Sequence, residues 1–241
     1  MHRLLVPSAS LDEDCVTLSA EAARHLKVLR PRPGEELELF DGAGAARVYR
    51  YAGGRLEAAR EKVRFAAPGA SLTLFACVTK GSRWDWTIEK AVELGVARIV
   101  PVLSERCIVR LAAGERAAKA ARWRRIAEDA ARQSDAVWLP EVREAVDFPC
   151  ALDLVATCDR VFAGALVQPP APSLLAAVLR EPPGSRSFGL FVGPEGDFTP
   201  GELEALLARA VPTSFGPTVL RAETAAVFGL SVLAAAVAVR A

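Results

Sequence analysis

Histidine and paired cysteine are what this sequence most clearly lacks. Its 241 residues include two histidines and five cysteines, and no two cysteines are spaced as Cys-x-x-Cys. Structural zinc sites are built mainly from such residues, so we expect no metal site. An odd number of scattered cysteines also argues against a disulfide framework and favours reduced thiols, as in the cytoplasm.

A strong charge of one sign and a long apolar run are also absent. Lys and Arg number 30 against 29 Asp and Glu, so a nucleic-acid partner would have to be met by local basic patches. The first ten residues, MHRLLVPSAS, contain no apolar signal core. The longest apolar run, residues 225–239, is shorter than the about 20 residues that span a membrane. We therefore expect a soluble, cytoplasmic protein without a membrane partner.

Hydrophobic residues make up 51% of the sequence, which is enough for a core. They follow two different patterns along the chain. In residues 1–67, short alternating segments with glycine turns, such as 36–40 and 46–51, surround one helix at 19–30. This pattern predicts a small β-barrel domain. In residues 72–241, buried strands alternate with helices, which predicts a mostly parallel sheet.

The second domain is expected to hold the following elements. Strands are predicted over residues 72–78, 97–103, 188–192 and 213–215. Helices are predicted over residues 83–94, 115–133, 173–180, 199–210 and 223–240. The first of these helices should turn Trp86 inward. The last is apolar on nearly every side, so it is predicted to be buried either within one subunit or against a second subunit.

One stretch, FGLFVGPEGDFTPGE at residues 188–202, has the strongest local pattern. An apolar strand runs into a glycine turn, and Thr199 and Glu202 then form a capping box with Pro200 at the helix start. In α/β proteins such a turn often binds a ligand, because glycine allows close approach and the helix start offers free N–H groups. A plain strand–helix connection has the same pattern.

Four stretches, in this order and spacing, resemble the RsmE family. They are KGSR at residues 80–83 with EKAVELGV at 89–96, SERC at 104–107, GPEG at 193–196 and LRAETA at 220–225. Residues 25–42 are similar to the PUA-like barrel of that family. Its members methylate N3 of a uridine in small-subunit (16S) ribosomal RNA. The resemblance implies a SPOUT-type α/β domain whose C-terminal part forms a deep trefoil knot, preceded by a small PUA-like β-barrel that binds RNA.

The resemblance also implies S-adenosylmethionine as cofactor, held by the knotted loops, and a homodimer formed through the last helix. The chain departs from the family at a few positions. Asp197 stands where the family usually has a second glycine, and Thr218 and Ala222 replace a usual arginine and threonine. These departures leave two alternatives open: a SPOUT methyltransferase acting on transfer RNA, and an inactive RNA-binding or ribosome-assembly factor.

The expected cofactor-binding residues come from the GPEG and LRAETA stretches and their flanks. They are Leu190, Val192, Gly193, Pro194, Glu195, Gly196, Gly216, Leu220, Thr224 and Ala225. The glycines would allow close backbone approach, and the aliphatic side chains would form apolar walls. Glycines that merely serve turns would explain the same positions.

Methylation of uridine N3 requires removal of the N3 proton and stabilisation of the negative charge that spreads onto O2 and O4. Arg221 is the first candidate to meet that charge. Glu223 is expected to orient Arg221 or to accept the proton, and Glu195 is a second candidate base. Glu223 is equally well explained as a carboxylate that the dipole of the last helix favours in its first turn.

Candidate RNA-binding residues are basic side chains in three groups. They are Arg24, Lys27, Arg30 and Arg32 in the first domain, then Lys80 and Arg83, then Arg122, Arg124 and Arg125. The third group flanks Trp123, a combination that could contact phosphate and stack on a base. A solvated helix face would explain the third group equally well.

Overall fold

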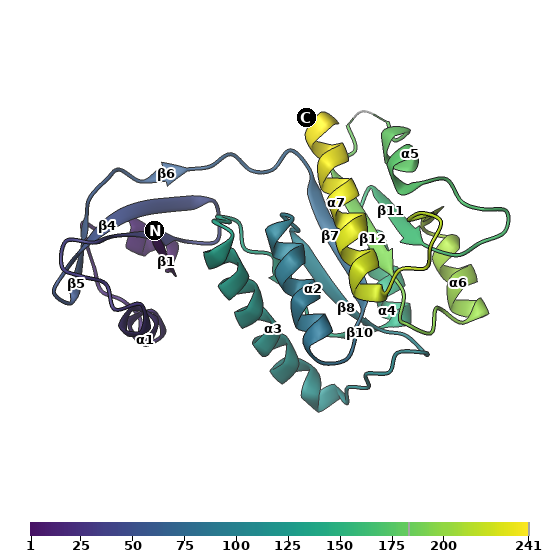
Figure 1. Cartoon of the computed structure of the whole chain (residues 1–241), viewed down its shortest axis with the longest axis horizontal. Helices are drawn as coiled ribbons and strands as arrows, with labels where there is room; N and C mark the ends of the chain where they lie inside the picture. The colour runs from purple at the N-terminus through teal and green to yellow at the C-terminus, as the bar shows by residue number, and fades with distance from the viewer. Residues whose placement is uncertain (183, 241) are drawn as a thin grey trace. The chain divides into compact units, whose positions relative to one another are not determined.

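The chain separates into two compact units in the computed structural model, which describes residues 1–182 and 184–240 (Figure 1). The first unit comprises Met1–Ala67 together with Glu128–Leu139. The second comprises Pro68–Ala127 and Pro140–Ala241. The sequence suggested one boundary near residue 67, whereas residues 128–139 return to the first unit.

The first unit is built on a six-stranded sheet in the order β1-β3-β4-β5-β2, with β6 paired to β4. The strands are β1 (His2–Leu5), β2 (Cys15–Val16), β3 (Glu36–Phe40), β4 (Ala45–Ala52), β5 (Arg55–Ala58) and β6 (Val63–Arg64). The β1–β3 pair is parallel and the others are antiparallel, including the predicted β3–β4 hairpin. Helix α1 (Ala20–Leu29) and a 3₁₀ turn (Ser8–Asp12) complete the unit.

Arg3 joins residues 128–139 to this sheet. Its guanidinium is buried, pairs with Glu38 (Nε–Oε1 2.6 Å) and lies 4.3 Å from the centroid of the Phe40 ring. The same group donates hydrogen bonds to the carbonyls of Ala131 (2.8 Å) and Ala136 (3.1 Å). Because a buried charge is costly without partners, these contacts hold the first unit together across a long stretch of chain.

The second unit is built on a parallel sheet in the order β10-β8-β7-β12-β11-β13, with β9 paired to β8. The strands are β7 (Ser71–Cys77), β8 (Arg98–Leu103), β9 (Glu141–Val142), β10 (Val146–Asp147), β11 (Arg160–Gly164), β12 (Ser187–Val192) and β13 (Val211–Thr213). The central strands are almost entirely buried, which suits a sheet covered on both faces. The predicted alternation of strands and helices is confirmed.

Helices cover both faces of the second sheet. They are α2 (Ser82–Glu93), α3 (Ala113–Gln133), α4 (Phe148–Val155), α5 (Leu174–Leu179), α6 (Pro200–Leu207) and α7 (Ala222–Arg240). Gly229 of α7 packs on Leu190, whereas α4 and α6 share a hydrophobic cluster with Phe191. Successive strand residues point to opposite faces, so α7 lies on one face and α4 and α6 on the other (Figure 1).

Two tryptophans, one predicted to face inward and one predicted to stack on a base, are placed differently from the prediction. Trp84, not Trp86, faces inward from α2, with Ile88 and Ala91 on the same side, and Trp86 is 39% exposed. Trp123 of α3 is buried and meets Trp84 edge-on, with ring centroids 5.6 Å apart. The expectations that Trp86 is inward and that Trp123 stacks on a base are therefore wrong.

Helix α7 is half inside the unit. Its Ala226, Leu230 and Leu233 are buried, and Phe228 is 41% exposed. By length and composition alone, Ala222–Val239 could cross a membrane, and 44% of that window is buried within the structure. The apolar stretch is thus longer than the run at residues 225–239, but a helix that packs on a sheet in this way passes the same test.

Candidate functional site

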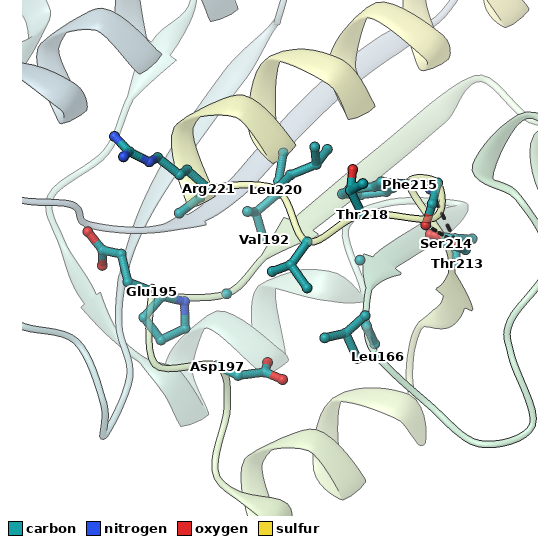
Figure 2. A pocket seen from close by; sticks show the side chains of 18 residues that line it. Leu166, Val192, Glu195, Asp197, Thr213, Ser214, Phe215, Thr218, Leu220 and Arg221 are labelled. Atoms are coloured by element: carbon teal, nitrogen blue, oxygen red, sulfur yellow. Dashed lines mark hydrogen bonds between the residues drawn. The ribbon is translucent and has the colours of Figure 1, made fainter.

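A pocket of about 320 Å³ opens at the carboxyl ends of β11, β12 and β13 (Figure 2). Its walls are the three segments that follow these strands, residues 164–166, 192–197 and 213–225. They contribute Gly164, Ala165, Leu166, Val192, Gly193, Pro194, Glu195, Asp197, Thr213, Ser214, Phe215, Gly216, Thr218, Val219, Leu220, Arg221, Ala222 and Ala225. The carboxyl edge of a parallel sheet is where α/β proteins bind ligands.

The wall after β12 is a tight turn held at both ends. The amide of Asp197 donates to the carbonyl of Pro194 (3.0 Å), and Asp197 adopts a left-handed φ of 58°. Helix α6 then begins with the predicted capping box, in which Thr199 Oγ1 accepts from the Glu202 amide and Glu202 Oε2 accepts from the Thr199 amide. Backbone groups of the turn are thereby fixed before any ligand binds.

The SERC stretch after β8 fastens this turn from outside the pocket. Arg106 donates to the carbonyls of Gly196 (3.1 Å) and Phe198 (3.3 Å), and the Glu105 amide donates to Glu202 Oε1 (2.8 Å). Gly196 faces Arg106, whose Cβ would lie 3.5 Å from a Cβ at that position. Two stretches singled out in the sequence therefore act as one support for the pocket wall.

Buried thiols lie beneath this support. Cys77 Sγ donates to Ser104 Oγ (3.4 Å), which lies 3.3 Å from Cys107 Sγ. The neighbouring Cys77 thiol and the Ser104 hydroxyl lower the pKa of Cys107 to about 6, whereas burial raises the pKa of Cys77. The other three cysteines are also free thiols, and of these Cys15 and Cys150 are exposed.

The wall after β13 depends on two glycines. Gly216 has a φ of 122°, a conformation that L side chains rarely adopt. The Gly216 amide donates a hydrogen bond to Ser214 Oγ (3.2 Å) and so closes the turn. Gly164 on the neighbouring strand lies under the Phe215 ring, whose Cε2 would be 2.5 Å from an added Cβ. These glycines set the shape of the pocket through close packing and backbone conformation.

Seven of the ten expected cofactor-binding residues line the pocket: Val192, Gly193, Pro194, Glu195, Gly216, Leu220 and Ala225. The other three, Leu190, Gly196 and Thr224, are outside the lining. Leu190 is fully buried under Gly229, Gly196 faces Arg106, and Thr224 is exposed on α7.

The three candidate catalytic residues differ in position. Arg221 and Glu195 line the pocket, and their side chains extend to the same side of it (Figure 2). Glu195 also pairs with Arg83 (Oε1–Nη1 3.2 Å). Glu223 does not line the pocket, and its Oε2 is buried without a hydrogen-bond partner among the described residues.

The first wall, Gly164–Leu166, and the segment from Thr213 to Phe215 were not anticipated as pocket residues. Neither contains a glycine motif flanked by a strong helix start, so local pattern gave no signal. The available signal was topological: strands that pair in parallel bring their following loops to one edge. It required knowing that β11 lies between β12 and β13.

The candidate RNA-binding residues are unequally available. Arg24, Lys27, Arg30 and Arg32 are all exposed on or just after α1, and Lys80, Arg83 and Arg125 are exposed in the second unit. Arg122 instead makes a two-point ion pair with Asp85, with one contact of 2.8 Å. Arg124 Nε donates to the Val142 carbonyl (2.9 Å). The basic group on α3 is therefore largely engaged within the protein.

The pocket suits a small, partly apolar ligand with positive charge. Leu166, Val192 and Leu220 supply apolar walls, and the turns supply backbone groups, in a volume at the lower end of the range for small-molecule sites. Two carboxylates and one guanidinium lie in the lining. Among residues 1–182 and 184–240, no cluster of three His, Cys, Asp or Glu could hold a metal ion.

Comparison with known proteins gives matches in both units of the chain. A family model described as an RNA methyltransferase domain matches residues 67–234, and one described as an RNA methyltransferase PUA domain matches residues 18–56. Ribosomal RNA small subunit methyltransferase E of Synechocystis sp. is 30% identical over 238 residues, or 95% of this chain and 76% of that protein. The same-named protein of Mycobacterium bovis is 35% identical over 211 residues, or 84% and 79%.

A solved structure also matches nearly the whole chain. Ribosomal RNA small subunit methyltransferase E from Neisseria gonorrhoeae, crystallised bound to S-adenosyl methionine, has a TM-score of 0.79 and 31% identity. The match covers 96% of this chain and 95% of that one.

Proposed function

The chain belongs to the RsmE family of ribosomal RNA methyltransferases, and from this membership we propose that it methylates N3 of a specific uridine in small-subunit (16S) ribosomal RNA, using S-adenosylmethionine. The observation that carries the proposal is the pocket formed after β11, β12 and β13, in a chain similar over 96% of its length to a relative bound to that cofactor.

The residues of the pocket fit this cofactor. Leu166, Val192 and Leu220 would enclose its apolar parts, and backbone groups of the Gly193 and Gly216 turns would meet its polar edges. When bound, S-adenosylmethionine supplies an activated methyl group. The protein holds the acceptor nitrogen in line with it and excludes water, which is mainly a task of positioning.

Arg221 is the residue we assign to the charge that develops on uracil. Loss of the N3 proton leaves negative charge on O2 and O4, and the guanidinium at the pocket edge stabilises it. Glu195 is the better candidate for proton acceptor than Glu223, because only Glu195 lines the pocket. Its ion pair with Arg83 (Oε1–Nη1 3.2 Å) orients the carboxylate. Arg83 is thereby a positioning residue for Glu195.

RNA contact is assigned to basic residues on each unit separately. The exposed side chains of Arg24, Lys27, Arg30 and Arg32 offer the first unit a phosphate-binding surface. In the second unit, Lys80 and Arg83 follow β7. The target base has to be single-stranded or flipped out, because N3 is engaged in a duplex.

Further features of the proposal come from the family resemblance. The segment after β13 would form a deep trefoil knot with the neighbouring loops, and two copies would associate through α7. The large apolar side chain of Phe228, which is exposed on α7, supports association through this helix. The residue 1–67 domain would be a PUA-like β-barrel that binds RNA, and the residue 72–241 domain would hold the cofactor. The enzyme would work in the cytoplasm, without a metal or a membrane partner.

Mass spectrometry of RNA from a deletion strain tests the function. We expect N3-methyluridine to disappear from 16S ribosomal RNA and to return when the intact gene is supplied. Persistence of that nucleoside would refute the assignment. Loss of a methylated uridine from transfer RNA instead would favour the alternative substrate. Calorimetry with S-adenosylmethionine addresses an inactive assembly factor, which should show no binding.

A further inference from the structure

Asp197 holds a left-handed backbone conformation, which among non-glycine residues aspartate and asparagine adopt most readily. Its φ of 58° lies in the left-handed region, where glycine is unstrained. The turn is closed by the Asp197 amide and the Pro194 carbonyl, and a glycine would close it equally well. One carboxylate oxygen accepts from the Phe198 amide (2.8 Å). Asparagine would suit the backbone and accept from the Phe198 amide equally well, so the local structure accounts for the shape of this residue but not for its charge.

Asp197 carries the unpaired negative charge of the pocket lining. Of the two carboxylates in the lining, Glu195 is paired with Arg83 at 3.2 Å. Asp197 has no ion pair with any cation in the described part of the chain. Figure 2 shows its carboxylate pointing toward the side where Leu166 lies, away from the side to which Arg221 and Glu195 extend. This side of the pocket thus carries negative charge without a protein partner.

We infer that Asp197 makes the pocket discriminate by charge, so that it holds the sulfonium cofactor S-adenosylmethionine more tightly than its neutral thioether product, S-adenosylhomocysteine. The inference rests on the proposed function. In methyl transfer, the N3 electron pair forms the new N–CH₃ bond, the S–CH₃ bond breaks with its electrons left on sulfur, and the N3 proton passes to a base. The positive charge on sulfur is lost in that step, and the attraction of Asp197 is lost with it.

Asp197 is accordingly a specificity-determining residue rather than an accelerator of the chemical step. Attraction to the sulfonium is strongest before transfer and weaker in the transition state, where the charge is already declining. Interactions of that kind lower KM without raising kcat. Removing the charge should therefore raise KM for S-adenosylmethionine and leave kcat unchanged or higher.

Calorimetry of Asp197→Asn with each ligand tests the inference directly. Asparagine tolerates the left-handed backbone and keeps an oxygen that can accept from the Phe198 amide, so only the charge is removed. We expect affinity for S-adenosylmethionine to fall about fivefold, as for a partly exposed ion pair. Affinity for S-adenosylhomocysteine should stay within about twofold of wild type by the same reasoning.

Asp135→Asn is the matched control. Asp135 is another aspartate with left-handed φ, 56°, and it does not line the pocket, so its substitution should leave both affinities unchanged. Asp197→Gly, which relieves strain and removes the charge, should reproduce the selective loss with a melting temperature no lower than wild type. Equal loss for both ligands, or loss for neither, would overturn the inference. A wild-type protein that binds neither ligand would instead refute the proposed function.

Discussion

Arg221 has the central role in the proposed chemistry, because it stabilises the negative charge that develops on uracil. Replacing it by alanine removes the guanidinium at the pocket edge but leaves the loops intact. We expect S-adenosylmethionine binding within about twofold of wild type, and methyl transfer slower by about 10²–10³, the usual effect of removing one donor to a developing negative charge. Calorimetry and transfer of labelled methyl onto 16S ribosomal RNA measure the two quantities.

Arg180→Ala provides the control for that substitution. Arg180 is exposed at the end of α5 and does not line the pocket, so its removal should change neither quantity. Unchanged turnover in Arg221→Ala would remove that residue from the mechanism.

At the residue scale, motif-bearing positions could be placed from the sequence and helix faces could not. The GPEG turn and the capping box form as expected, because glycine, proline and threonine act locally. Trp84 and Trp86 differ by two positions on α2, or about 200° around a helix, and apolar character alone does not fix which one faces the core. Glu223 was a candidate catalytic residue, but its position in the first turn of α7 leaves it outside the pocket lining.

At the scale of elements, the packing of α7 on β12 depends on Gly229. A Cβ there would lie 2.6 Å from Leu190 Cδ2, and Leu190 is fully buried, so its neighbours would have to shift with it. Gly229→Ala gains about 1 kcal/mol of helix propensity and costs about 1–3 kcal/mol of overpacking. We expect the free energy of unfolding in urea to fall by about 1 kcal/mol.

Gly201→Ala separates packing from propensity. Gly201 lies in α6, and nothing lies within 4 Å of the position of its added Cβ. We expect that variant to gain up to about 1 kcal/mol of stability. If Gly229→Ala raises the free energy of unfolding as much as Gly201→Ala does, that result would contradict the close contact between α7 and β12.

Helix α1 should carry part of the electrostatic attraction to RNA. Arg24 and Lys27 are exposed, and replacing both by alanine removes two phosphate-binding charges. We expect weaker RNA binding at low salt and a slope of log affinity against log salt that is smaller by about 1.4, from about 0.7 per charge on single strands. Filter binding at several salt concentrations gives the slope.

Arg122→Ala serves as the comparison, because Arg122 is already paired with Asp85. Its slope should stay close to that of wild type. A slope that changes more in Arg122→Ala than in the α1 variant would move the RNA surface away from α1.

At the scale of the whole molecule, the proposed dimer requires Phe228 to be buried between the two copies. This residue is 41% exposed on α7, and a carboxylate there would be buried without a partner in an apolar interface. We expect wild type to elute as a dimer and Phe228→Asp as a monomer in size exclusion with light scattering. Val28→Asp, at an exposed position of α1, should remain a dimer. A monomeric wild type would contradict the association.

The order of strands and the division of the chain are features that the sequence did not reveal. Alternating strands and helices predicted a parallel sheet, but not that β12 lies between β7 and β11. Helix α3 runs without interruption from Ala113 to Gln133, although its last residues belong to the first unit. No glycine, proline or change of composition marks that division, because the helix itself is regular.

The return of Glu128–Leu139 to the first unit has a consequence for how the protein is made. The carbonyl acceptors of Arg3, on Ala131 and Ala136, are synthesised 128 and 133 positions after Arg3 itself. The N-terminal unit therefore cannot finish folding as it emerges, and it waits through synthesis of β7, α2 and β8. The pocket waits longer still, because its last wall, which ends at Ala225, is completed close to the end of the described chain. Elongation therefore supplies every segment of the first unit before it supplies the last wall of the pocket.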